Sequence, residues 1–162
     1  YNLVRPYTYA HHNPQQNYAH YNQPLAHPLG ANFSEFLVMA NYKYKRWQLD
    51  GKLIFVKYGA KVTGDDTSYG NDLYESTGIF EEPSGKVYEG RPSDFGIVMY
   101  QGNLTTVNLK FFNIAYIVNP KTNLKINLGV TLRDFKNEDE ELQTQFINFG
   151  IKSDLFNHYY DF

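Results

Sequence analysis

Alternation of apolar and polar residues near the end of the sequence is the feature that most constrains how this chain can fold. Two runs carry it: Leu124, Ile126, Leu128, Val130 and Leu132 in the first, and Ile147, Phe149 and Ile151 in the second. A period of two places successive side chains on opposite faces of an extended strand. The stretch 123–162 therefore predicts two strands, each with one apolar and one polar face, joined by the acidic turn at 138–141.

Four more segments have strand-like patterns, and they cover approximately residues 1–9, 36–45, 47–56 and 98–118. In the last of them the apolar positions shift by one residue at Phe111–Phe112, which predicts a β-bulge there. The sequence thus predicts an all-β chain of about six antiparallel strands.

The lengths of the connections alternate. Long loops are expected at about 10–33 and 62–97, and tight turns near Arg46 and at 119–122. Outer-membrane β-barrels have long loops on one side of the membrane and short turns on the other. We therefore expect an antiparallel up-and-down transmembrane β-barrel, although the acidic connection is short. Six strands are too few to close such a barrel, since the smallest ones have about eight. Residues 1–162 are then the C-terminal segment of one larger barrel.

Composition limits the alternatives. A net charge of −2 over 162 residues gives no electrostatic reason to expect a nucleic-acid partner. There is no cysteine, and no apolar run approaches the roughly 20 residues of a transmembrane helix. Aromatic residues make up 17% of the chain, a supply that suits the aromatic girdles at membrane interfaces. An aromatic-rich soluble β-sandwich stays open as the alternative.

Within the barrel interpretation, each strand has a side that faces lipid and a side that faces the lumen. The residues predicted to face lipid are Val38, Leu53, Phe55, Leu109, Leu128, Val130 and Phe149. The opposite side is predicted to have a basic lining, which favours anions if the barrel is open: Lys43, Lys45, Lys52, Lys110, Lys125, Arg133 and Lys152. Tyr160 and Phe162 at the end are predicted to serve as the assembly signal.

Two stretches carry a family resemblance. One is Gln-Pro-Leu-Ala-His-Pro-Leu-Gly-Ala-Asn-Phe at 23–33, and the other is the tail at 149–162. They resemble the C-terminal third of Wzi-like capsule-assembly outer-membrane proteins, in the branch found in Bacteroidota that includes barrels linked to gliding motility. Asp154 and His158 depart from the regular apolar spacing of a terminal assembly signal.

The resemblance implies a many-stranded barrel in the outer membrane of a Gram-negative bacterium, in contact with lipopolysaccharide. It also implies a surface role: organising capsular polysaccharide, or serving a gliding-motility or secretion complex with other outer-membrane or periplasmic subunits. The family offers no catalytic motif that could be carried over to this chain.

Sites that would carry chemistry are weakly indicated. His11, His12, His20 and His27 share one loop, but no carboxylate lies among them, so we expect no metal. The acids of the second loop lack the pattern of a calcium loop, and a solvated acidic loop is the simpler interpretation. No nucleophile motif or phosphate-binding glycine loop is present, so we expect neither enzymatic activity nor a cofactor.

Loop tyrosines are the remaining candidates. They could stack on sugar rings, or they could simply pack the loops: Tyr18, Tyr21, Tyr69, Tyr74 and Tyr88. Three functions therefore compete. The first is a non-enzymatic barrel that organises surface polysaccharide or belongs to a motility or secretion complex. The others are an outer-membrane pore or transporter, and a soluble all-β carbohydrate-binding domain.

Overall fold

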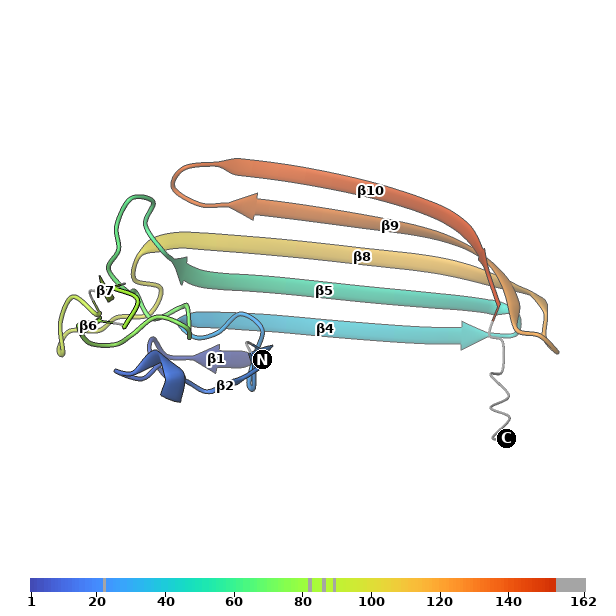
Figure 1. Ribbon diagram of the computed structural model, residues 1–162. Coiled ribbons are helices and arrows are strands. Elements are labelled where there is room, and N and C mark those ends of the chain that lie inside the picture. Colours follow the sequence, from blue (N-terminus) through green and yellow to red (C-terminus); the bar gives the residue numbers. More distant parts are fainter. Residues whose placement is uncertain (22, 82, 86, 89, 154–162) are drawn as a thin grey trace, which may run out of the picture. The chain divides into compact units, whose positions relative to one another are not determined.

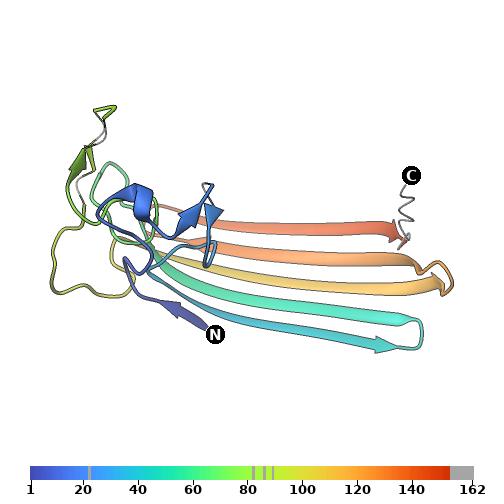
Figure 2. The same cartoon turned by 60° about the horizontal axis from the view of Figure 1, so that its bottom comes forward.

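A computed structural model describes residues 1–153 except 22, 82, 86 and 89, so the predicted assembly signal at Tyr160 and Phe162 lies outside the described residues. The chain is all-β, and its main feature is one 6-stranded sheet with the order β1-β4-β5-β8-β9-β10 (Figures 1 and 2). The all-β, six-stranded antiparallel prediction is therefore confirmed. The strands are β1 (Asn2–Val4), β4 (Phe33–Tyr44), β5 (Trp47–Ala60), β8 (Asn103–Asn119), β9 (Leu124–Lys136) and β10 (Glu141–Lys152).

The first strand is shorter than predicted. β1 pairs antiparallel with the start of β4, with Asn2 opposite Glu35 and Val4 opposite Phe33. The pairing stops there because Pro6 has no N–H for the ladder, and Tyr7 has a left-handed φ of 61°. The chain then leaves the sheet.

The predicted bulge in β8 is wrong. Leu109 and Phe111 line one hollow together with Lys52, whereas Phe112 and Ile114 line another. Simple alternation along the strand therefore continues through Phe111–Phe112. Before this point the apolar residues of β8 lie on one face, and after it they lie on the other. No extra residue is inserted, so the switch reflects a change in what each face contacts.

The chain divides into two compact units, described here separately. The loop unit comprises Tyr1–Phe36, Phe55–Val107 and Phe135–Leu142, and the sheet unit comprises Leu37–Ile54, Asn108–Asp134 and the residues from Gln143 onward. Both long connections belong to the loop unit, and the two tight turns belong to the sheet unit. The short elements of the long connections are η1 (Pro14–Gln16), β2 (Ala19–His20), β3 (Gln23–Pro24), β6 (Phe80–Glu81) and β7 (Val87–Tyr88).

Asn32 is the central residue of the loop unit. It is fully buried, and its φ of 56° lies in the left-handed region, where asparagine is favoured. Its Nδ2 donates to the carbonyl oxygens of Gly59 (3.2 Å), Tyr69 (3.2 Å) and Gln101 (2.9 Å). Its Oδ1 accepts from the backbone N–H of Tyr100 at 2.6 Å. One carboxamide thus joins the start of β4, the end of β5, the second long loop and the segment before β8.

The residues beside Asn32 are packed just as tightly. Phe33 is 0% exposed and Ala31 2%. A Cβ at Gly30 would collide with the carbonyl oxygen of Asn71, whose own Nδ2 donates to the carbonyl oxygen of Ala31 at 2.8 Å. The second half of the distinctive 23–33 stretch is therefore the anchor that holds the two long loops together.

The sheet unit has hardly any core of its own. In the part of it that the structure describes, Ala115 and Ile117 are the apolar side chains that are buried. Phe149 and Ile151 on β10 are more than two-thirds exposed. Exposed apolar surface on this scale marks a site of interaction with a protein partner, a ligand or a membrane.

Replacing Asn32 by Asp tests the anchor. An aspartate has no N–H group, so it would leave carbonyl oxygens unpaired and place its charge against them. We expect the loop unit to lose about 3 kcal/mol or more of unfolding free energy, measured by chemical denaturation of the full-length protein in detergent. Asn13→Asp is the matched control, because Asn13 uses only its acceptor oxygen, toward the N–H of Gln15. Equal stability of the two variants would contradict this role for Asn32.

Candidate functional site: a sheet with two unlike faces

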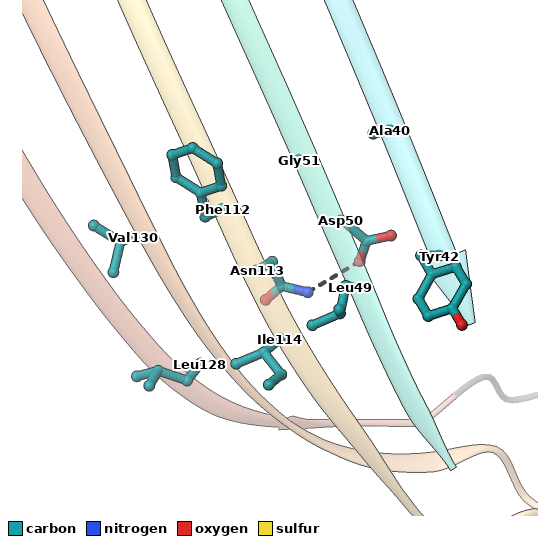
Figure 3. A pocket seen from close by; sticks show the side chains of 10 residues that line it. All are labelled: Ala40, Tyr42, Leu49, Asp50, Gly51, Phe112, Asn113, Ile114, Leu128 and Val130. Atoms are coloured by element: carbon teal, nitrogen blue, oxygen red, sulfur yellow. Dashed lines mark hydrogen bonds between the residues drawn. The ribbon is translucent and has the colours of Figure 1, made fainter. Parts of the chain in front are cut away.

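One face of the sheet unit is apolar and hollowed at its centre. The hollow has a volume of about 400 Å³ and lies over β4, β5, β8 and β9 (Figure 3). Two of its lining residues are small, Ala40 on β4 and Gly51 on β5. The larger side chains around them are Tyr42, Leu49, Phe112, Ile114, Leu128 and Val130. We call this side the apolar face.

Aromatic residues mark the end of the apolar face that lies toward the tight turns. The rings of Trp47 and Tyr116 meet edge to face at 4.9 Å, and both line a second hollow of about 440 Å³. Lys45 Nζ lies 5.2 Å from the centre of the Tyr44 ring. Trp, Tyr and Lys together are typical of the boundary between apolar lipid and water.

An ion pair marks the other end of the apolar residues on β8. Lys110 Nζ lies 3.5 Å from Asp134 Oδ2, and alternation puts both on the same face as Phe112. From Lys110 to Tyr116 the strand rises about 20 Å. Because the strands of outer-membrane barrels tilt by about 35–45°, this stretch would cover roughly 15 Å of their roughly 25 Å apolar band.

The opposite, polar face is organised around Asp50. Its carboxylate accepts from Asn41 Nδ2 at 2.7 Å, from Asn113 Nδ2 at 3.1 Å and from Gln48 Nε2 at 3.2 Å. Lys125 Nζ in turn donates to Gln48 Oε1 at 3.2 Å. This network crosses β4, β5, β8 and β9, so the polar groups of this face are paired laterally between neighbouring strands.

A glycine extends the polar face to the last strand. A Cβ at Gly129 would collide with the side-chain amide of Asn148 on β10. The amide of Asn148 therefore lies against the backbone of β9, where only glycine leaves it room. The neighbouring residue, Phe149, is consequently on the apolar face.

Six of the seven predicted lipid-facing residues keep a common strand parity, and one does not. Within the sheet unit, Val38, Leu53, Leu128, Val130 and Phe149 lie on the apolar face. In the loop unit, Phe55 packs on Phe36, with ring centres 6.4 Å apart. Leu109 is on the polar face, where it lines a hollow of about 400 Å³ with Phe111 and Lys52. Leu109 therefore lies on the opposite side of the sheet from the other predicted lipid-facing residues of the sheet unit, because the strand has no inserted residue at Phe111–Phe112.

Charge is distributed unequally between the two units, which the net charge of −2 conceals. The sequence of the sheet unit has nine Lys or Arg residues and four Asp or Glu residues. The loop unit has six and thirteen, respectively. The seven basic residues predicted to line a lumen all belong to the sheet unit. Lys110 lies on the apolar face and Lys45 is in a turn. The other five have the strand parity of the polar face: Lys43, Lys52, Lys125, Arg133 and Lys152.

The loop unit contains a small polar cavity. Its volume is about 140 Å³, and its lining includes Lys61, Tyr69, Asn71, Asp72 and Glu75. Lys61 Nζ pairs with Glu75 Oε1 at 2.8 Å, and this hydrogen bond raises the pKa of Lys61.

The structure does not bring the predicted sugar-contacting tyrosines to this cavity as a group. Of the five, Tyr69 is the one among its described lining residues. Tyr18 packs on Tyr9 with ring centres 5.7 Å apart, and Tyr21 is 89% exposed beside His20. The backbone N–H of Tyr74 donates to Asp72, and Tyr88 belongs to β7, with its side chain outside the described residues.

The histidines of the first loop have separate surroundings. His27 packs on Phe33 and lies 3.3 Å from Glu35, whereas His11 Nδ1 accepts from the N–H of Asn13 at 3.1 Å. In the described ranges no three His, Cys, Asp or Glu residues are arranged to hold a metal ion. The same ranges include no helix of the length and apolarity needed to span a membrane.

Comparison with known proteins identifies no relative. No protein-family model matches the chain, and neither the curated proteins nor the solved structures give a significant match. The two faces of the sheet and the chemistry of the loops are therefore the features that bear on function.

The hydroxyl of Tyr7 provides a titration test of the loop unit. It donates to the carbonyl oxygen of Ser68 at 2.6 Å and accepts from Gln101 Nε2 at 2.9 Å, and burial raises its pKa to about 12. Because the unfolded chain releases this proton near pH 10, the contribution of Tyr7 to stability is complete below pH 10 and is lost as pH rises through 12.

Alkaline titration followed by tyrosinate absorbance should show a late component that Tyr7→Phe removes. Tyr1→Phe, which changes an exposed side chain, should leave that component in place. Loss of the late component in both variants, or in neither, would contradict the assignment to Tyr7.

Proposed function

We propose that this chain forms part of the wall of a non-enzymatic outer-membrane β-barrel in a Gram-negative bacterium, with a role at the cell surface. The single observation that carries the proposal is the two-faced sheet unit. Its apolar face ends in aromatic residues at Trp47 and Tyr116, and its polar face is laterally paired around Asp50. Lipid on one side and a polar lumen on the other satisfy both faces.

The alternative of a soluble sandwich fits the two faces less well. A sandwich covers the apolar face of each sheet with a second sheet. The described part of the chain consists of one 6-stranded sheet and two 2-stranded ones, and each of the 2-stranded sheets belongs to the loop unit. A bilayer supplies the missing cover without a second layer.

The unpaired strand edges are where the barrel would be completed. β1 pairs with Phe33–Glu35 only, so the same edge of β4 is open from Leu37 to Tyr44 in the described structure. β10 is the last strand in the order of the sheet. Open edges in lipid leave backbone groups unsatisfied at several kcal/mol each. In this proposal further strands, from the same protein or from partner chains, pair with both edges.

Orientation follows from the connections. We place the tight turns at the periplasmic side, because outer-membrane barrels have their short turns there and their long loops at the cell surface. Acidic loops at the surface could meet lipopolysaccharide phosphates through bridging divalent cations. Loops anchored around Asn32 give the protein a shaped outer surface, which supports organisation of surface polysaccharide or membership of a gliding-motility or secretion complex.

A pair of leucines tests which face meets lipid. Leu128→Arg puts a charge on the apolar face, whereas Leu109→Arg puts the same charge on the polar face near Lys52. We expect Leu128→Arg to cost about 2–4 kcal/mol of folding free energy in bilayers and Leu109→Arg clearly less. Folding of the full-length protein into liposomes, followed by urea titration, measures both. Equal costs, or a greater cost for Leu109→Arg, would overturn the barrel orientation.

Deletion of the gene tests the surface role. Cells without the protein should release their surface polysaccharide or lose movement over surfaces, and the native protein should restore the phenotype. A variant shortened within 79–89, a range that leaves out the Asn32 partner Tyr69 and the Ala31 partner Asn71, should still fold into the outer membrane but fail to restore the phenotype, because the loops carry the role. Full restoration by that variant would contradict a loop-based surface function, and conductance of the purified protein in planar bilayers would favour a pore instead.

A further inference from the structure

We propose that the apolar face binds an ordered glycerophospholipid, with an acyl chain in the central groove and the phosphate at the basic tight turns. The inference rests on the barrel proposal, because it requires this face to meet lipid. It adds a specific ligand class and a place on the sheet to that proposal.

The groove is built by small residues where the neighbouring positions carry large ones. Gly51 on β5 lies between Phe112 on β8 and Ala40 on β4, and the larger Leu49 and Tyr42 follow two positions away on the same strands (Figure 3). The fold does not need glycine at position 51: its φ is not in the left-handed region, and an added Cβ would have its nearest contacts at 3.9 Å. The sheet itself does not require glycine at this position. The effect of the glycine is to leave space on the apolar face.

The groove continues toward the turns. The central hollow of about 400 Å³ and the second hollow of about 440 Å³ share Ile114 and Leu128, so they adjoin. The second one is bordered by Trp47 and Tyr116. An elongated apolar groove that ends at amphipathic aromatic rings matches an acyl chain. The carbonyl and the headgroup of the lipid would begin where these rings lie.

Cations lie at the end where the headgroup would be. The β4–β5 turn carries Lys45 and Arg46, the β8–β9 turn carries Lys121, and Figure 1 shows both turns at the same end of the sheet. Neither turn contains an acidic residue. The carbonyl oxygen of Arg46 accepts from the N–H of Ile117 at 2.8 Å, which ties the first turn to β8. Lysine and arginine at a membrane surface attract the phosphates of anionic lipids.

The charge distribution selects a phospholipid over a lipopolysaccharide. In the proposed orientation the tight turns are at the periplasmic leaflet, which consists of phospholipids, and both turns carry lysine or arginine. The charged side chains of the two turns, Lys45, Arg46 and Lys121, are all basic. The ligand is therefore an anionic glycerophospholipid of the inner leaflet.

The experiment uses full-length protein folded from denaturant into lipid-free detergent micelles and titrated with phosphatidylglycerol or phosphatidylcholine, with binding measured by native mass spectrometry. Gly51→Leu fills the groove, and Val38→Leu adds bulk on the same face without lining either hollow. We expect Gly51→Leu to weaken phosphatidylglycerol binding several-fold and Val38→Leu to leave it unchanged. The double variant Arg46→Gln/Lys121→Gln should abolish the preference for phosphatidylglycerol over phosphatidylcholine.

Equal binding by wild type and Gly51→Leu, or no preference for phosphatidylglycerol in the wild type, would overturn the lipid site. The leucine-to-arginine comparison separates this failure from failure of the barrel proposal. If Leu128→Arg lowers the free energy of unfolding and Leu109→Arg does not, the apolar face meets lipid. That conclusion holds even if Gly51→Leu still binds phosphatidylglycerol. If the two arginine variants behave alike, both proposals fail.

Discussion

The described part of the sheet unit consists of a single sheet layer, and much of the structure follows from this constraint. A strand buries one face by packing against something, yet here Ala115 and Ile117 are the apolar side chains that the unit buries in its described part. The apolar face, with Phe149 and Ile151 largely exposed, has its cover outside the sheet. Burial at about 25 cal/mol per Å² of apolar surface is the main stabilising term in folding, so the missing cover is an energetic requirement and not a detail.

The loop unit differs from the sheet unit in what must be satisfied. It has many backbone polar groups outside regular strands and few apolar side chains to bury. Long connections expose carbonyl and N–H groups that must be paired when they are buried. Asn32 meets this need with polar atoms: one carboxamide satisfies carbonyl oxygens of Gly59, Tyr69 and Gln101 and the N–H of Tyr100. Ser76 and Thr105, both fully buried, belong to the same polar type of core. Such a core fixes loop shape where apolar packing is scarce.

Periodicity predicted the strands because the two-residue repeat responds directly to faces, and so the positions of β4, β5, β9 and β10 were largely accessible. The faces of β8 could not be predicted in the same way. A shift of the apolar positions at Phe111–Phe112 looks the same in the sequence whether a bulge causes it or a change in what each face contacts. The Asn32 anchor was also inaccessible, since its partners lie 27 to 69 residues away. The separation of charge became visible only when the two units were known.

Glycines on the two faces show how differently the sheet uses a missing side chain. On the polar face, Gly129 is required, since the amide of Asn148 occupies the position where its Cβ would be. On the apolar face, a Cβ added at Gly51 would make only ordinary van der Waals contacts, at 3.9 Å from Ala40 and Phe112, so no neighbour requires glycine there. A gap on the polar face is thus filled from within the chain. A gap on the apolar face is left open toward the surroundings, which argues that a ligand from those surroundings, and not the fold, accounts for the glycine.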